Sequence, residues 1–141
     1  MNNLPRFRAW HKEEKRILHI HTMTWGCQDD LDFVYACFHP YDCKHYDPLD
    51  LILMQWTGLQ DKNGKDIYEG DIIEVCTHFE DRRNQRLYYV YRDIINGIWS
   101  LRITNEPHKD MLSYYKFCQP VTEGSIIVGN IYENPELLKD D

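Results

Sequence analysis

The sequence has 141 residues, of which 43% are hydrophobic and 28% are charged, a composition that fits one folded domain and excludes an intrinsically disordered chain. With 23 acidic and 16 basic residues, the net charge of −7 argues against a protein that covers nucleic acid with a basic face. Apolar runs such as residues 51–54 are far shorter than the roughly 18 residues of a membrane span. The start lacks the apolar stretch of a signal peptide, so we expect a cytoplasmic protein with no membrane segment.

The chain begins with two predicted strands, 7–10 and 17–23, on either side of a charged loop. A β-hairpin is the simplest assignment, although the loop residues 12–16 also favour a helical turn. Because side chains alternate along a strand, His19 and His21 are expected on one face of the second strand.

The next segment, 28–48, is the part of the sequence whose structure is hardest to predict. It mixes acidic and histidine residues with five aromatic residues, namely Phe33, Tyr35, Phe38, Tyr41 and Tyr46. Two interpretations remain open for it, an extra hairpin or an excursion that binds a partner.

Glycine-containing turns separate the strands predicted in the middle of the chain. Residues 49–57 form an apolar run that ends at a glycine and predicts a buried strand. Asn63-Gly64 supplies the positive φ angles of a tight turn, and a glycine bend at Gly70 leads into a β-branched strand over 72–76.

The clearest hairpin joins strands 87–95 and 98–103 through Asn96-Gly97. A type I′ turn needs positive φ at Gly97, so a β-branched residue there is expected to destabilise the protein.

A last strand is predicted over 125–132, and Asn134-Pro135 is typical of the start of a short helical turn over 136–139. Many short strands, with no long amphipathic helix between them, predict an all-β protein built as a small β-barrel.

A cluster of basic and aromatic residues within 82–92 is the one feature that favours nucleic-acid binding. Such residues can clamp and stack single strands, but Glu80, Asp81 and Asp93 dilute the charge, so a solvated strand face is the preferred interpretation. The cluster comprises Arg82, Arg83, Tyr88, Tyr89, Tyr91, Arg86 and Arg92.

The cysteines are expected to be free thiols, because their number is odd and no secretory signal precedes them. They are Cys27, Cys37, Cys43, Cys76 and Cys118.

A second candidate site is a cluster of potential zinc ligands, Cys37, His39, Cys43 and His45. Thiolate and imidazole are the groups that zinc prefers, and this cluster defines a third functional hypothesis, a small metal-dependent enzyme. The spacing is not that of a standard zinc finger, and free cysteines are often buried hydrophobic residues. We therefore expect the four side chains not to converge on one ion.

Catalytic motifs are missing from the sequence. It contains no phosphate-binding glycine loop, no Gly-x-Ser-x-Gly and no His-Glu-x-x-His. A nucleophilic pair of Cys27 with His19 or His21 rests on sequence proximity alone. A non-catalytic protein with no cofactor is therefore favoured over an enzyme.

Three blocks of the sequence together resemble the YopX family of bacteriophage and prophage proteins. They are Phe-Arg-Ala-Trp at 7–10, Met-Gln-Trp-Thr-Gly-Leu-Gln-Asp-Lys-Asn-Gly-Lys at 54–65 with its continuation to 73, and Val-Gly-Asn-Ile-Tyr-Glu-Asn-Pro-Glu-Leu-Leu at 128–138. His11 stands where the family usually has aspartate, and Trp56 where tyrosine is common.

This resemblance implies a single domain over 1–141. It would comprise an N-terminal β extension at 1–57, including an unmatched loop at about 26–50, and an SH3-like β-barrel at 58–141. It also implies an accessory protein of phage or integrated mobile DNA in the bacterial host cytoplasm, with no catalytic residues to transfer. We expect it to act through contacts with a host or phage protein, or with itself; association with nucleic acid is the alternative.

Self-association is expected because strand edges and aromatic side chains beyond one small barrel need to be covered. Pairing with a second subunit would bury Trp10, Trp25, Phe33, Tyr35 and Phe38. The alternative is that these elements fold back onto their own chain.

Overall fold

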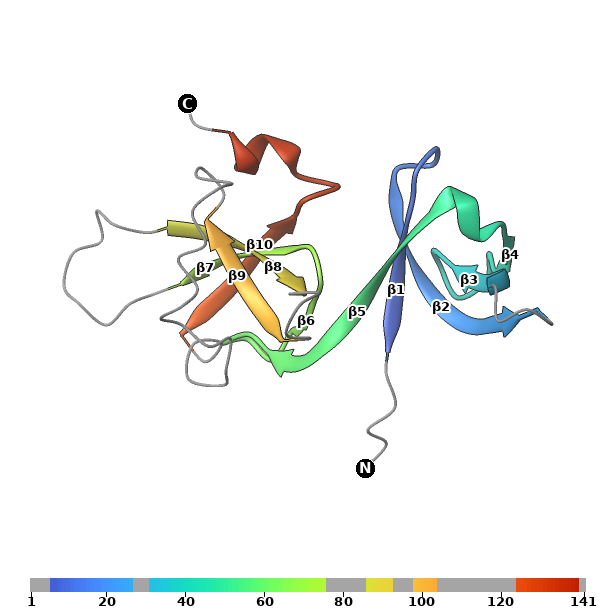
Figure 1. Cartoon of the computed structure of the whole chain (residues 1–141), viewed down its shortest axis with the longest axis horizontal. Helices are drawn as coiled ribbons and strands as arrows, with labels where there is room; N and C mark the ends of the chain where they lie inside the picture. Colours follow the sequence, from blue (N-terminus) through green and yellow to red (C-terminus); the bar gives the residue numbers. More distant parts are fainter. Residues whose placement is uncertain (1–5, 27–30, 76–85, 93–97, 104–123, 140–141) are drawn as a thin grey trace. The chain divides into compact units, whose positions relative to one another are not determined.

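The computed structural model describes residues 6–26, 31–75, 86–92, 98–103 and 124–139, and these form a mostly β protein (Figure 1). The strands belong to two antiparallel sheets, and two short 3-10 helices accompany them in the described segments. The elements are β1 (Phe7–His11), β2 (Arg16–Trp25), β3 (Leu31–Cys37), β4 (Lys44–Tyr46), η1 (Pro48–Asp50), β5 (Leu51–Gln60), β6 (Asp66–Tyr68), β7 (Asp71–Val75), β8 (Arg86–Arg92), β9 (Trp99–Ile103), β10 (Ser125–Asn130) and η4 (Pro135–Leu138).

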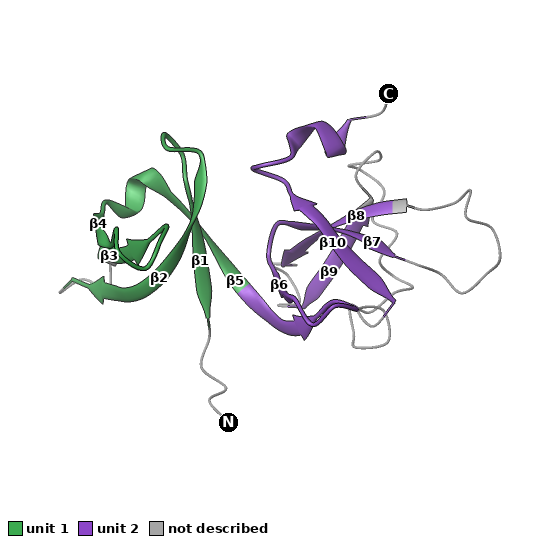
Figure 2. Cartoon of the chain, turned by 180° about the vertical axis from the view of Figure 1, so that it is seen from behind, with its two compact units in different colours: residues 1–55 green, residues 56–141 purple. Residues whose placement is uncertain are grey.

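The chain divides into two compact units, Met1–Gln55 and Trp56–Asp141, which Figure 2 distinguishes by colour. Unit 1 contains strands in the order β4-β3-β2-β1-β5, and unit 2 contains the sheet β10-β7-β8-β9. Strand β5 begins in unit 1 and ends in unit 2, where its last residues pair with β6.

The predicted N-terminal hairpin is confirmed, with β1 and β2 paired up to His11 and Arg16. His11 is buried, and its Nδ1 accepts a hydrogen bond from the backbone N–H of Glu14 at 3.0 Å. The imidazole therefore stabilises the turn at the position where the YopX family, which this sequence resembles, usually has aspartate.

The segment 28–48, for which the sequence allowed two interpretations, contains the strands β3 and β4. These strands pair with each other, so the extra hairpin is the interpretation that the structure supports. Its apolar residues complete the core of unit 1. That core consists of Ala9, Leu18, Val34, Ala36, Tyr46 and Leu51. Trp10 is also buried within the chain, so the expectation that a partner subunit is needed to cover it is wrong.

Strand β5 differs at both ends from the predicted 49–57. Asp47 accepts a hydrogen bond from the N–H of Leu49 at 2.9 Å and Pro48 follows it, so the chain forms a 3-10 turn before the strand begins. At the other end, Gly58 has a φ of 84°, and β5 continues past it with a shift in its pairing to β6. The glycine bends the strand and does not end it.

The turn at 61–65 is confirmed, with one correction to its geometry. Gly64 has a φ of 78°, whereas Asn63 is not in the positive-φ region. The backbone N–H of Asp61 donates to the carbonyl of Lys65 at 2.9 Å, closing the loop. The expected glycine bend at Gly70 is also present, with a φ of 85°.

The core of unit 2 consists of Ile67 of β6, Ile73 of β7, Val90 of β8 and Leu101 of β9. The β8–β9 hairpin is confirmed, but its register pairs Arg92 with Trp99, whereas an uninterrupted ladder from a two-residue turn at Asn96-Gly97 would pair it with Leu101. The turn residues 93–97 lie outside the described segments.

The C-terminal turn is observed as η4, with Asn134 at its N-cap position and proline at its start. Asn134 makes no capping bond with its side chain; its Oδ1 instead accepts from the N–H of Asn130 at 3.3 Å. Among the described residues, no helix has the length and apolar character needed to cross a membrane.

Candidate functional site

The loop between β3 and β4 is closed by a disulfide between Cys37 and Cys43, whose Cα atoms lie 4.1 Å apart. The expectation of free thiols is therefore wrong for this pair, because the hairpin places the two residues opposite each other across six positions of sequence. Cys27, Cys76 and Cys118 lie outside the described segments.

Asp42 orders the loop from within. Its Oδ1 accepts hydrogen bonds from the backbone N–H groups of Phe38 at 3.0 Å and His39 at 2.7 Å. Both bonds lower the pKa of the Asp42 carboxyl, and the bond from His39 has the larger effect. The loop geometry therefore has a support that does not depend on the disulfide.

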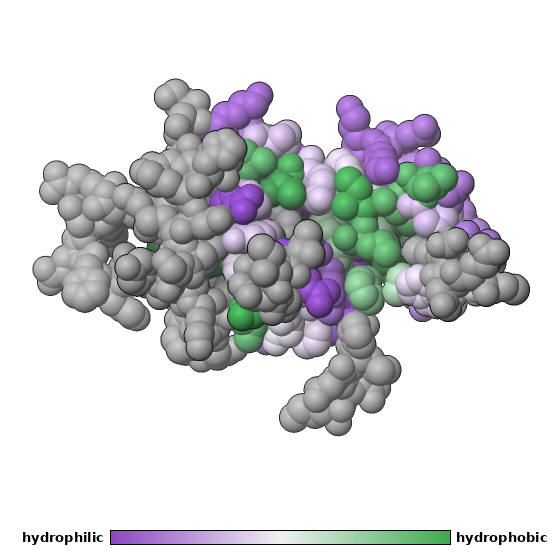
Figure 3. Space-filling model, viewed as in Figure 1, coloured by the Kyte–Doolittle hydropathy of each residue, from purple (hydrophilic) through white to green (hydrophobic). Residues whose placement is uncertain are grey.

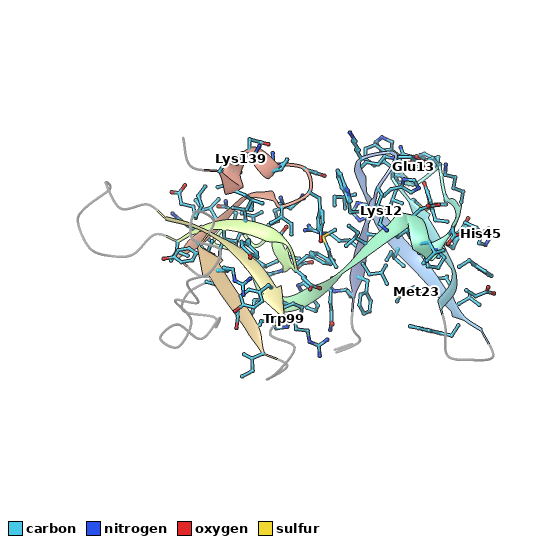
Figure 4. All side chains as sticks on the ribbon, turned by 45° about the horizontal axis from the view of Figure 1, so that its top comes forward. Lys12, Glu13, Met23, His45, Trp99 and Lys139 are labelled. Carbon is cyan, nitrogen blue, oxygen red and sulfur yellow. A yellow bond between two sulfur atoms is a disulfide. The ribbon has the colours of Figure 1, made fainter. Side chains whose placement is uncertain are left out.

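The structure brings together only two of the four predicted zinc ligands. His39 packs against Phe38, with ring centroids 4.4 Å apart. His45, on β4 in Figure 4, contacts the rings of Phe33 and Tyr35, each at 4.9 Å. Both histidines are held by aromatic neighbours, away from the pair of cysteines.

A histidine outside the predicted set, His21, lies beside Cys37 and Cys43. Its ring nitrogen and the two Sγ atoms all lie within 4.8 Å of one another. The strand β2 pairs regularly through His19–Cys37 and Ile20–Ala36 and then skips His21, so the bulge turns this side chain toward the end of β3. The sequence predicted only that His19 and His21 share one face of this strand, and it contained no signal that the strand bulges at His21; both side chains are exposed on β2.

An ion network connects the β1–β2 turn with β4. Glu14 contacts Lys44 Nζ at 3.0 Å and Arg16 Nε at 2.6 Å, and both partners lower the pKa of the Glu14 carboxyl, that of Lys44 foremost. The Arg16 guanidinium also lies over the Phe38 ring, 4.6 Å from its centroid. The Glu14–Lys44 ion pair therefore connects the first hairpin with β4, and Arg16 connects it with the disulfide loop through Phe38.

Among the described residues, large apolar side chains reach solvent mainly in unit 1. Figure 3 shows hydrophobic residues at the surface of both units. Trp25 is 61% exposed, Tyr41 99% and Leu49 80%, with Phe38 at the lower value of 37%. Among the described residues of unit 2, only Ile98 and Val128 are exposed large hydrophobics. Unit 1 therefore offers most of the exposed apolar contact groups in the described segments.

The polar residues of the middle sequence block have structural partners in unit 2. Buried Asp61 accepts from the N–H groups of Asn63 and Lys65 at 2.9 Å each, and from that of Ile127 at 3.1 Å. Buried Asp71 accepts from the N–H of Tyr68 at 2.8 Å. These carboxylates stabilise turns, which explains why the block needs them.

The basic and aromatic cluster of β8 is divided between two faces of the strand. Tyr88 packs against the core of unit 2, whereas Tyr89 and Tyr91 lie on the other face with their rings 6.2 Å apart. Arg102 of β9 covers them, at 4.5 Å from Tyr91 and 5.9 Å from Tyr89. Arg82 and Arg83 lie outside the described segments.

Comparison with known proteins finds a matching family and similar solved structures. A family model described as YopX protein matches residues 6–139. The crystal structure of protein EF1440 from Enterococcus faecalis is similar at 27% sequence identity and a TM-score of 0.68, covering 98% of this chain and 100% of that one. No curated protein sequence matches the chain. Both similarities extend over almost the whole length of the chain.

Proposed function

Because the chain belongs to the YopX family, we propose that it is an accessory protein of phage or integrated mobile DNA that acts in the host cytoplasm by contacting proteins, without catalysis. The exposed apolar side chains of unit 1 carry this proposal. Trp25 and Tyr41 are 61% and 99% exposed, and aromatic side chains of this kind are enriched in protein interfaces.

The architecture we propose for residues 58–141 is an SH3-like barrel, with 1–57 as a β extension of the same domain. The short strands β6 to β10 and the tight turns at Gly64 and Gly70 support it. In this arrangement the barrel is the scaffold and the extension supplies the contacts.

The first partner we propose is a second copy of the chain, and the second is a host or phage protein. Four aromatic residues of unit 1 are available for such a contact, namely exposed Trp25 and Phe38 and half-buried Phe33 and Tyr35. Trp10 is buried and is not available. Covering exposed apolar groups by symmetric pairing is the commonest form of association in soluble proteins.

Light scattering at micromolar concentration tests self-association, since the chain alone has a mass of 17.0 kDa. We expect a multiple of that mass, and a return toward 17.0 kDa in the double variant Trp25→Ser, Tyr41→Ser. The matched control is Val128→Ser in unit 2, which is 40% exposed and is expected to leave the mass unchanged.

Capture from phage-infected host lysate with the same three proteins tests contact with another protein. A protein retained by the wild type and the Val128→Ser control but lost by the double variant supports the proposal. A constant 17.0 kDa mass together with identical capture by all three proteins would refute it.

Association with nucleic acid is the alternative, and the pair of tyrosines with Arg102 on β8 and β9 is the observation that favours it. Fluorescence anisotropy with a single-stranded oligonucleotide decides between the two. Binding that weakens steeply with salt and is lost in Arg102→Ala would favour the alternative, whereas no binding at low salt would exclude this site.

A further inference from the structure

The side chains of His21, Cys37 and Cys43 come from three different segments, the bulge of β2, the end of β3 and the residue before β4. We propose that this triad binds a zinc ion when the disulfide is reduced. The disulfide and the metal would then be alternative bridges across the same loop.

The distances within the triad suit one small ion. The His21 ring nitrogen and both Sγ atoms lie within 4.8 Å of one another. Ligand atoms around tetrahedral zinc, at about 2.0–2.3 Å from the metal, stand about 3.5–3.8 Å apart. Once the sulfur–sulfur bond is broken, rotation of the cysteine side chains is enough to reach this spacing.

The surrounding loop is already formed for both states. Asp42 accepts hydrogen bonds from the N–H groups of Phe38 and His39, and β3 and β4 remain paired through Tyr35 and His45. None of these contacts uses the sulfur–sulfur bond. Reduction therefore leaves Cys37 and Cys43 close together, and little ordering free energy is needed when the metal binds.

The histidine is the reason to infer a metal in addition to a disulfide. A disulfide needs no imidazole beside it, yet the bulge of β2 turns His21 toward the sulfur atoms. The His21 ring also contacts Tyr35 edge-on, with centroids 6.3 Å apart, which restricts its orientation. Two cysteines and one histidine form a ligand set that zinc uses in proteins.

The chemistry balances with an external thiol reductant. The disulfide takes up two electrons and two protons and becomes two thiols, while two reductant thiols are oxidised to a disulfide. Zinc then displaces both thiol protons to solvent. Two thiolates and a neutral imidazole cancel the charge of Zn²⁺, so no net charge enters the site.

The triad supplies three of the four ligands of a tetrahedral zinc ion and leaves one coordination position open. Cys37 is buried and Cys43 half-buried, whereas His21 is exposed. Water from the His21 side therefore completes the four ligands. His39 and His45 are not needed, since aromatic neighbours hold their rings elsewhere.

Metal titration of the reduced full-length protein tests the proposal. The chain is reduced with a phosphine under anaerobic conditions and titrated with Co²⁺, whose thiolate charge-transfer absorption reports sulfur ligation, and zinc is then added as a competitor. We expect one metal ion per chain in the reduced protein, zinc displacing cobalt, and no absorption band in the oxidised protein.

Variants separate this triad from the other cysteines. Cys43→Ser should abolish the band, and His21→Ala should weaken zinc binding at least about tenfold. The control His19→Ala removes an exposed histidine two positions away on the same strand and should leave affinity within about twofold. Circular dichroism verifies that each variant is folded.

Any one of the following results would overturn the inference. They are the absence of a cobalt band in the reduced wild type, a band that persists in folded Cys43→Ser, and equal zinc affinity in wild type and folded His21→Ala. Equal losses in His21→Ala and His19→Ala would also reject the assignment of His21 as a ligand.

Discussion

Replacing Asp61 by alanine tests whether the middle sequence block serves the fold. The Asp61 carboxylate accepts three backbone hydrogen bonds and joins the 61–65 turn to β10 through Ile127. A hydrogen bond to a charged group contributes about 1.5–3 kcal/mol net. The N–H groups of Asn63 and Lys65 belong to exposed residues and regain water, whereas the tie to Ile127 is lost, so we expect Asp61→Ala to cost about 3 kcal/mol.

Urea unfolding followed by tryptophan fluorescence measures this loss as a lower midpoint at unchanged slope. Asp61→Asn keeps one acceptor oxygen without the charge and should lose about half as much. The matched control Asn63→Ala removes an exposed side chain from the same turn and should change stability by less than about 0.5 kcal/mol. If the free energy of unfolding of Asp61→Ala lies within about 0.5 kcal/mol of the wild-type value, the conclusion that the carboxylate stabilises the turn is refuted.

Three further changes give defined results. Gly129→Ala should cost about 1–2 kcal/mol in urea unfolding, because its Cβ overlaps the Asn134 side chain; if the added Asn134→Ala restores nothing, the overlap is not the cause. Lys44 is the largest cause of the lowered pKa of the Glu14 carboxyl, and the His39 N–H is the largest cause of the lowered pKa of Asp42. The stability that these two carboxylates contribute is therefore complete above the unfolded pKa of about 4 and is lost as pH falls through their lower folded pKa values. Thermal melts from pH 5 to pH 2 should show this loss, with a smaller drop in Glu14→Gln; equal drops would exclude Glu14. Gly97→Val should lower the melting temperature if residue 97 needs positive φ, and an unchanged value would reject that turn.

Local chemistry made much of the fold predictable. The β1–β2 hairpin and the turn at Gly64 each depend on signals within a few residues, such as a charged loop or a glycine, whereas the register of β8 and β9 differs from the one that a turn at Asn96-Gly97 predicts. The start of β5 was missed because a cap and a proline, Asp47 and Pro48, outweigh the apolar run that follows.

The candidate site was less predictable because it depends on contacts between strands. Sequence spacing grouped Cys37 and Cys43 with His39 and His45, but aromatic neighbours hold both histidines away from the sulfur atoms. His21 reaches the cysteines through a bulge in β2, and strand alternation contains no signal for a bulge. Where two strands must pair before residues meet, composition and spacing alone do not identify the set.

Photocrosslinking in phage-infected host cells tests most directly whether unit 1 is the contact surface. A photoreactive phenylalanine analogue replaces Tyr41, which is 99% exposed, or Val128 of unit 2, which is 40% exposed. We predict a specific crosslinked protein, either a second copy of the chain or another protein, from position 41 and none from position 128. Crosslinks from position 128 alone, or from neither position, would contradict the proposal that this protein acts through the exposed apolar side chains of unit 1.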